Sequence, residues 1–165
     1  MDHRFITLVA ALATLTASVS FAHGNASHEP KPHQYVAAQV VETAFGRQGD
    51  PRKASRAFTV EMTDRMQFTP PLLTLKRGET IRITAANTGQ LRHELVLGTP
   101  QEIMRHSDDM KQHPGMEHDE PHMVHVAPGQ QGELVWQFTK PGEFQFACLL
   151  PGHYEAGMVG KVVVQ

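Results

Sequence analysis

From Ala57 to Val164 the chain is a succession of short apolar or alternating segments separated by turn residues. In Thr80 to Ala85 polar and apolar side chains alternate with a period of two, as in a strand that has one face in a core. Strands do not alternate regularly with helices, which argues against a parallel sheet. We therefore predict an all-β chain folded as an antiparallel sandwich or barrel.

The expected strands cover residues 57–62, 72–75, 80–85, 91–97, 132–138, 143–148 and 158–164. Before them, the apolar piece from Val36 to Val41 is interpreted as a first strand, followed by a loop that runs to Arg56.

One helix is expected in the long interruption after residue 97. Thr99-Pro100-Gln101-Glu102 has the pattern of a capping box with proline at the first helical position. The helix should end before Pro114, and on it His106, Met110 and His113 would share one face.

The N-terminal segment has the pattern of a secretory signal. Arg4 is basic, residues 5–19 contain no charge, and Ser20-Phe21-Ala22 offers a cleavage site, so we expect a periplasmic protein cut after Ala22. Nothing later has the apolar length of a bilayer-spanning helix. The expected organisation is a signal peptide at 1–22, a flexible His-containing arm with a first strand and loop at 23–56, and one domain at 57–165 with an insertion at about 99–125.

The chain contains one cysteine, Cys148, and therefore no internal disulfide. An unpaired cysteine in an exported protein is an idle buried thiol, a reactive thiol or a metal ligand. The formal net charge of −2 gives no reason to expect a nucleic acid or an anionic membrane as partner.

Cys148 belongs to a C-x4-H-x4-M motif that ends at His153 and Met158 and joins two expected strands. Thiolate, imidazole and thioether on one loop form most of the ligand set of a blue-copper site, which needs a second imidazole. His93, inside the apolar segment 91–97, is our candidate. The alternative is a core histidine satisfied by hydrogen bonds.

Residues 66–83, Asn87-Thr88-Gly89, His93-Glu94-Leu95-Val96 and the Cys148 loop together resemble the cupredoxin family, which includes plastocyanin and azurin. The resemblance covers roughly 57–165 and is nearest to the periplasmic copper-tolerance cupredoxins of the CopI-like type, which carry a His- and Met-rich insertion after the first ligand strand. It implies a Greek-key β-sandwich with a short helix in that insertion.

The resemblance also implies one type 1 copper centre, cycling between Cu(I) and Cu(II), with His93, Cys148 and His153 as ligands and Met158 as a weak axial ligand. Many members have Asn directly after the first histidine, where it ties the two ligand segments together. Here that position is Glu94.

Between residues 104 and 125, five histidines and four methionines are interleaved with five carboxylates. Such a mixture suits further copper ions, although it also fits an amphipathic helix and a polar loop with solvated histidines. If cleavage follows Ala22, the free amine and imidazole of His23 could also chelate Cu(II). The candidate secondary copper residues are His106, Met110, His113, Met116, His118, His122, Met123, His125 and His23.

Two functions remain open: a periplasmic copper-tolerance protein, or a soluble one-electron carrier between respiratory enzymes. A carrier needs one copper, so the second cluster favours tolerance. We do not expect an enzyme, because copper reductases and oxidases need a further copper centre at a domain interface. We expect a monomer. Its expected partners are copper ions and a redox or copper-transfer protein.

Overall fold

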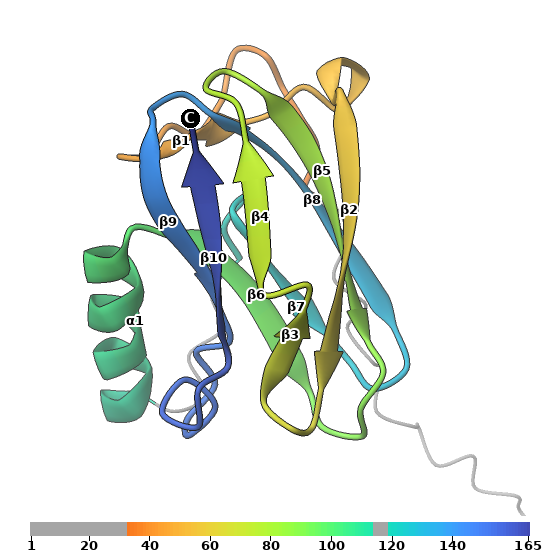
Figure 1. Ribbon diagram of the computed structural model, residues 1–165, viewed down its shortest axis with the longest axis vertical. Coiled ribbons are helices and arrows are strands. Elements are labelled where there is room, and N and C mark those ends of the chain that lie inside the picture. The colour runs from red at the N-terminus through yellow and green to blue at the C-terminus, as the bar shows by residue number, and fades with distance from the viewer. Residues whose placement is uncertain (1–32, 114–118) are drawn as a thin grey trace, which may run out of the picture.

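The computed structural model describes residues 33–113 and 119–165. In these ranges two five-stranded sheets face each other and one α-helix lies outside them (Figure 1). A 3-10 turn, Pro51–Lys53, precedes β2 (Arg56–Thr63). The predicted signal peptide at 1–22, His23, Met116 and His118 fall outside the described residues. No helix within them is both long and apolar enough to span a membrane.

The first sheet has the order β1-β8-β5-β2-β3 and the second the order β4-β10-β9-β6-β7. Neighbouring strands are antiparallel except for the pairs β2/β5 and β4/β10, which are parallel. The bounds in the first sheet are β1 Gly46–Gln48, β2 Arg56–Thr63, β3 Gln67–Thr69, β5 Thr80–Asn87 and β8 Gln131–Phe138. Those in the second are β4 Leu72–Leu75, β6 His93–Gly98, β7 Met123–Val126, β9 Gly142–Ala147 and β10 Val159–Val164.

The main core lies between the two sheets, as strand alternation requires. In β4, Leu73 and Leu75 are buried whereas Leu72 is half exposed. Large side chains such as Trp136 and Phe146 fill the interior. Period-two burial on facing sheets is the geometry of a β-sandwich, so the predicted fold class is confirmed.

Strand β6 is buried along its whole length because both of its faces are covered. Leu95 and Leu97 point into the main core, while Val96 packs in a second cluster with Ile103 of the helix α1, Pro100–Gln112. Alternation places His93 on the same side as Leu95.

Helix α1 begins as predicted: Thr99 is the N-cap, its hydroxyl accepts from Glu102 N–H, and the Glu102 side chain accepts from the Thr99 backbone. The helix ends at Gln112 with His113 as its C-cap, and the His113 N–H still donates to the Asp109 carbonyl at 2.9 Å. The predicted helix end is therefore confirmed, and the grouping of His106, Met110 and His113 on one helical face stays a prediction.

The remaining differences concern short strands. The piece from Val36 to Val41 forms a turn closed by a 2.8 Å bond from Gln39 N–H to the Val36 carbonyl, and the first strand is β1. Strands β3 and β7 were not predicted, and β7 belongs to the insertion, which pairs with β6.

The β2–β3 turn, the β5–β6 connection and the β9–β10 loop gather at one end of the sandwich, at the bottom of Figure 1. The candidate ligands lie at this end.

Candidate metal centre

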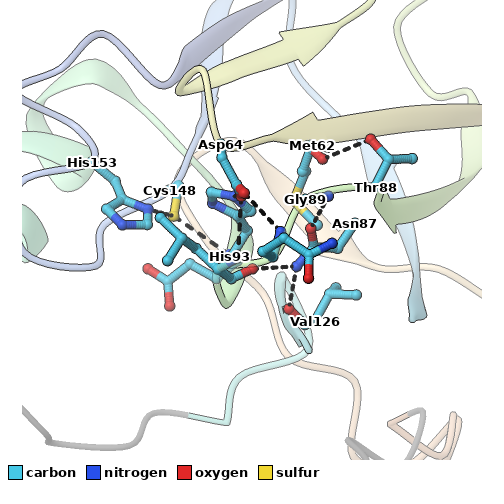
Figure 2. A network of polar contacts seen from close by, with 12 residues as sticks. Met62, Asp64, Asn87, Thr88, Gly89, His93, Val126, Cys148 and His153 are labelled. Carbon is cyan, nitrogen blue, oxygen red and sulfur yellow. Dashed lines mark hydrogen bonds and ion pairs between the residues drawn. The ribbon is translucent and has the colours of Figure 1, made fainter. Parts of the chain in front are cut away.

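Three nitrogen and sulfur donors meet where β6 begins and β9 ends. His93 is the first residue of β6, Cys148 follows β9, and His153 lies in the loop leading to β10. One donor atom of each lies within 4.8 Å of the others. Sγ of Cys148 is 3.3 Å from Nδ1 of His153, and the two imidazole centroids are 5.1 Å apart. In Figure 2 the sulfur lies between the two rings.

The loop from Cys148 to Met158 is closed by its own backbone. Gly152 and Gly157 have φ angles of 86° and 93°, which side chains disfavour, and so allow the tight turns. Met158 N–H donates to the His153 carbonyl at 3.0 Å, and Cys148 N–H donates to the Met158 carbonyl at 3.1 Å. These bonds hold the three residues of the motif together.

Met158, the fourth predicted ligand, is completely buried just before β10. Its backbone bonds place it beside both Cys148 and His153. Coordination through its thioether remains a prediction.

The Cys148 thiol is also completely buried. Burial, and next the negative charge of Glu94, raises the pKa of Cys148 to about 12. The Glu94 backbone N–H donates to Sγ at 3.4 Å, which favours the thiolate and partly offsets this rise. Without a metal the sulfur therefore carries its proton at neutral pH.

The two imidazoles are suited to binding a metal. His93 is completely buried, and its Nδ1 has no hydrogen-bond partner in the described ranges. Leaving such an atom unpaired is costly unless it serves as a ligand. Burial, and next the neighbouring His93, lowers the pKa of His153, so its ring is neutral at neutral pH. A thiol and two imidazoles fit a soft or borderline metal ion.

Glu94 links the two ligand segments through a buried carboxylate. Oε1 accepts the Leu149 N–H at 2.8 Å, and Oε2 lies 3.0 Å from Nδ1 of His125. The first contact joins β6 to the ligand loop, which is the role that the family resemblance assigns to Asn at this position. The Glu94 carboxylate is therefore also the contact partner of the His125 ring.

The candidate secondary residues do not form one cluster in the described parts of the chain. Met110 and Met123 are buried with Ile103 and Leu149, which gives both a packing role. His113 is exposed at the end of α1. Among residues 33–113 and 119–165, the group containing Cys148 is the only one in which three His, Cys, Asp or Glu donors converge.

His106 and His122 line a cavity of about 410 Å³ between α1 and residues 41–45. Glu102, Asp109 and Glu120 also line it. The His122 ring contacts the Phe45 ring edge-on, with centroids 5.9 Å apart. Burial lowers the pKa of His122.

Sequence reasoning missed two polar residues beside the centre. Asp64, in the β2–β3 turn, contacts the His93 ring, with Oδ1 3.2 Å from Nε2. Asn87 ends β5 and bonds both to the following loop and to the Val126 carbonyl, at 3.0 Å. The Asn87-Thr88-Gly89 turn motif could have indicated the role of Asn87. No pattern around Asp64 indicated its contact.

Comparison with known proteins shows that the chain is similar to copper-binding proteins. Residues 54–165 match the family of copper binding proteins described as plastocyanin/azurin. A copper-resistant cuproprotein CopI of Rubrivivax gelatinosus is 49% identical over 157 residues, covering 95% of this chain and 93% of the relative. A protein of the same description from Pseudomonas aeruginosa is 38% identical over 151 residues, covering 74% and 83%.

Solved structures show the same fold. Auracyanin B aligns with a TM-score of 0.61 at 20% identity, covering 73% of this chain and 96% of that one. An azurin of Methylomonas sp. strain J aligns with a TM-score of 0.55 at 14% identity, covering 68% and 99%. Taken with the matched family and the long alignments to CopI, this chain belongs to the plastocyanin/azurin family of copper-binding proteins as a CopI-like cupredoxin.

Proposed function

We propose that this chain is a periplasmic copper-resistance protein that binds one copper ion through His93, Cys148, His153 and Met158. The observation that carries the proposal is the convergence of one sulfur and two imidazoles within 4.8 Å, at a largely buried position. The CopI relatives, which are copper-resistant cuproproteins by name, support the physiological role.

The residue types explain why the site would hold copper in both oxidation states. Thiolate and thioether favour Cu(I), and imidazole suits Cu(I) and Cu(II) alike. When bound, copper would add a one-electron couple, as in the electron carriers of this family. The chain contributes a donor set fixed by loop and strand hydrogen bonds, which excludes water around His93 and Cys148.

Export is the second part of the proposal. Residues 1–22 have the features of a cleaved signal, and residues 23–56 and 57–165 would form the arm with its first strand and the domain. Mass spectrometry of protein from the periplasmic fraction should give a chain that starts at His23. Another start removes His23 as an N-terminal chelator, and protein found only in the cytoplasm contradicts export.

Growth on copper tests the physiological role. Deleting the gene should lower the copper concentration that stops growth. The wild-type gene should restore tolerance and Cys148→Ser should not. A gene that restores tolerance equally well with Cys148→Ser would remove this site from the function.

A soluble electron carrier is the second candidate. His153 is the most exposed of the three donors, and Leu150 and Pro151 beside it offer a partly apolar surface for a redox or copper-transfer partner. Unchanged copper tolerance together with a respiratory defect in the deletion strain would favour the carrier.

The proposal also includes a second copper site in the insertion, formed by His106 and His122. Both line the same cavity, which Glu102, Asp109 and Glu120 also line. The double variant His106→Asn/His122→Asn should lose copper bound beyond the first equivalent, whereas exposed His113→Asn should not. A wild-type stoichiometry that stays at one under excess copper contradicts the second site.

A further inference from the structure

We propose that Asp64 is a positioning residue for the centre: its carboxylate fixes the His93 ring so that Nδ1 faces Cys148, and it anchors the loop before β6. This inference rests on the proposed function and assigns a role outside the four ligands.

Asp64 receives two backbone N–H groups from the segment that ends at His93, and it also contacts the His93 ring. Oδ2 accepts the Gln90 N–H at 2.7 Å, and Oδ1 accepts the Leu91 N–H at 3.1 Å. Oδ1 also lies 3.2 Å from Nε2 of His93. Figure 2 shows the carboxylate above this loop and the ring.

The Asp64 carboxylate oxygens already accept backbone N–H groups, and Oδ1 faces the ring as a further acceptor. In this arrangement Nε2 of His93 donates to Oδ1, which leaves Nδ1 as the ring nitrogen available to a metal. Nδ1 is the buried atom without a partner in the described ranges. Carboxylates that hold the outer nitrogen of a ligand histidine fix its tautomer and orientation in metal sites generally.

Asn87 secures the same loop from the other side. Its Oδ1 accepts the Gly89 N–H at 2.9 Å, and its Nδ2 donates to the Leu91 carbonyl at 2.7 Å. Glycine is required at 89 because a Cβ there would overlap the Asp64 carboxylate. Asp64 lies in a turn between two strands of the first sheet, and His93 begins a strand of the second. Their contact therefore also joins the two sheets at the metal-binding end.

The test compares Asp64→Asn and Asp64→Ala with Glu61→Gln, which removes the same charge from an exposed position in β2. Both Asp64 variants should bind copper about 10–100-fold more weakly, the usual effect of losing such a partner. Their reduction potentials should rise, because a negative charge near the metal that favours Cu(II) is gone. Glu61→Gln should match the wild type in both properties.

Two measurements on the metal-free protein separate positioning from folding and from the proposed function. Imidazole nitrogen chemical shifts should report a proton on Nε2 of His93 in the wild type and a mixture of tautomers in Asp64→Asn. Amide exchange at Gln90 and Leu91 should accelerate in both variants, if Asp64→Ala folds.

An unchanged His93 tautomer and unchanged copper affinity in Asp64→Asn would overturn the positioning role. A wild-type protein that binds no copper would instead overturn the proposed function, and the tautomer measurement would still decide the role of Asp64.

Discussion

In the proposed site, Cys148 sets how copper binding depends on pH. The metal-free thiol has a pKa of about 12, because burial, and next Glu94, disfavours the thiolate. Copper needs the thiolate, so binding releases a proton at any pH below that value. Since the His153 pKa is lowered, the His153 imidazole adds little to this dependence above neutral pH.

The apparent copper affinity of Cys148 should therefore rise about tenfold per pH unit between about pH 7 and 9. Competition against a chelator of known pH behaviour measures this slope. An affinity that is flat over the same range would show that the thiolate does not bind the metal.

Glu94 contributes to this high pKa through its buried charge. Glu94→Gln keeps an oxygen that can accept the Leu149 N–H but removes the charge. We expect the Cys148 pKa to fall, as followed by ultraviolet thiolate absorbance in the metal-free protein. A pKa that stays the same or rises in this variant would contradict the electrostatic role of Glu94.

Helix α1 supports the ligand loop. Its buried face, including Met110, packs with Leu149 directly after Cys148 and with Tyr154 directly after His153. Lys111 on the same helix pairs with Glu155 of the loop, with Nζ 2.7 Å from Oε1. The insertion is thus part of the structure that positions the loop.

Met110→Ala should lower the free energy of unfolding of the metal-free protein by about 2–5 kcal/mol, because it leaves a cavity in that cluster. Met104→Ala is the matched control on the same helix. Met104 is 56% exposed, so its truncation should change stability by no more than about 0.5 kcal/mol. Equal effects of the two substitutions in urea denaturation would contradict the packing role of Met110.

Element-scale prediction worked best where local patterns are strong. The alternation in β5 and the capping box at Thr99 are local signals, and both elements form where they were expected. Strand β7 was missed because its four residues, including Met123 and His125, share the composition of a metal-binding insertion. Its strand character arises from pairing with β6, which no local pattern reveals.

At the scale of the whole molecule, the pattern of short alternating strands predicted the all-β fold class, and motif spacing predicted the meeting of Cys148 and His153. The approach of His93 was inferred from the need for a second imidazole and from its place in an apolar segment, and the geometry confirms that approach. Asp64 was missed because its contact joins a turn of the first sheet to the start of β6 in the second sheet. A contact of this kind depends on how the sheets pack, and side-chain types within one segment cannot encode it.

Copper binding to the folded state should stabilise the whole domain. At a free copper concentration about a hundredfold above the Kd, the gain is about 2.7 kcal/mol for one site. The Tm of the wild type should therefore rise with copper, whereas that of Cys148→Ser should rise much less. Equal increases in calorimetry would place the stabilising site elsewhere.

The most direct test of the central claim is the optical and paramagnetic-resonance spectrum of the protein loaded with one equivalent of Cu(II). The proposed ligand set predicts strong visible absorption from charge transfer between the Cys148 thiolate and copper, absent in Cys148→Ser. A wild-type spectrum without that band, or a band that survives the substitution, would contradict a copper centre built on this cysteine.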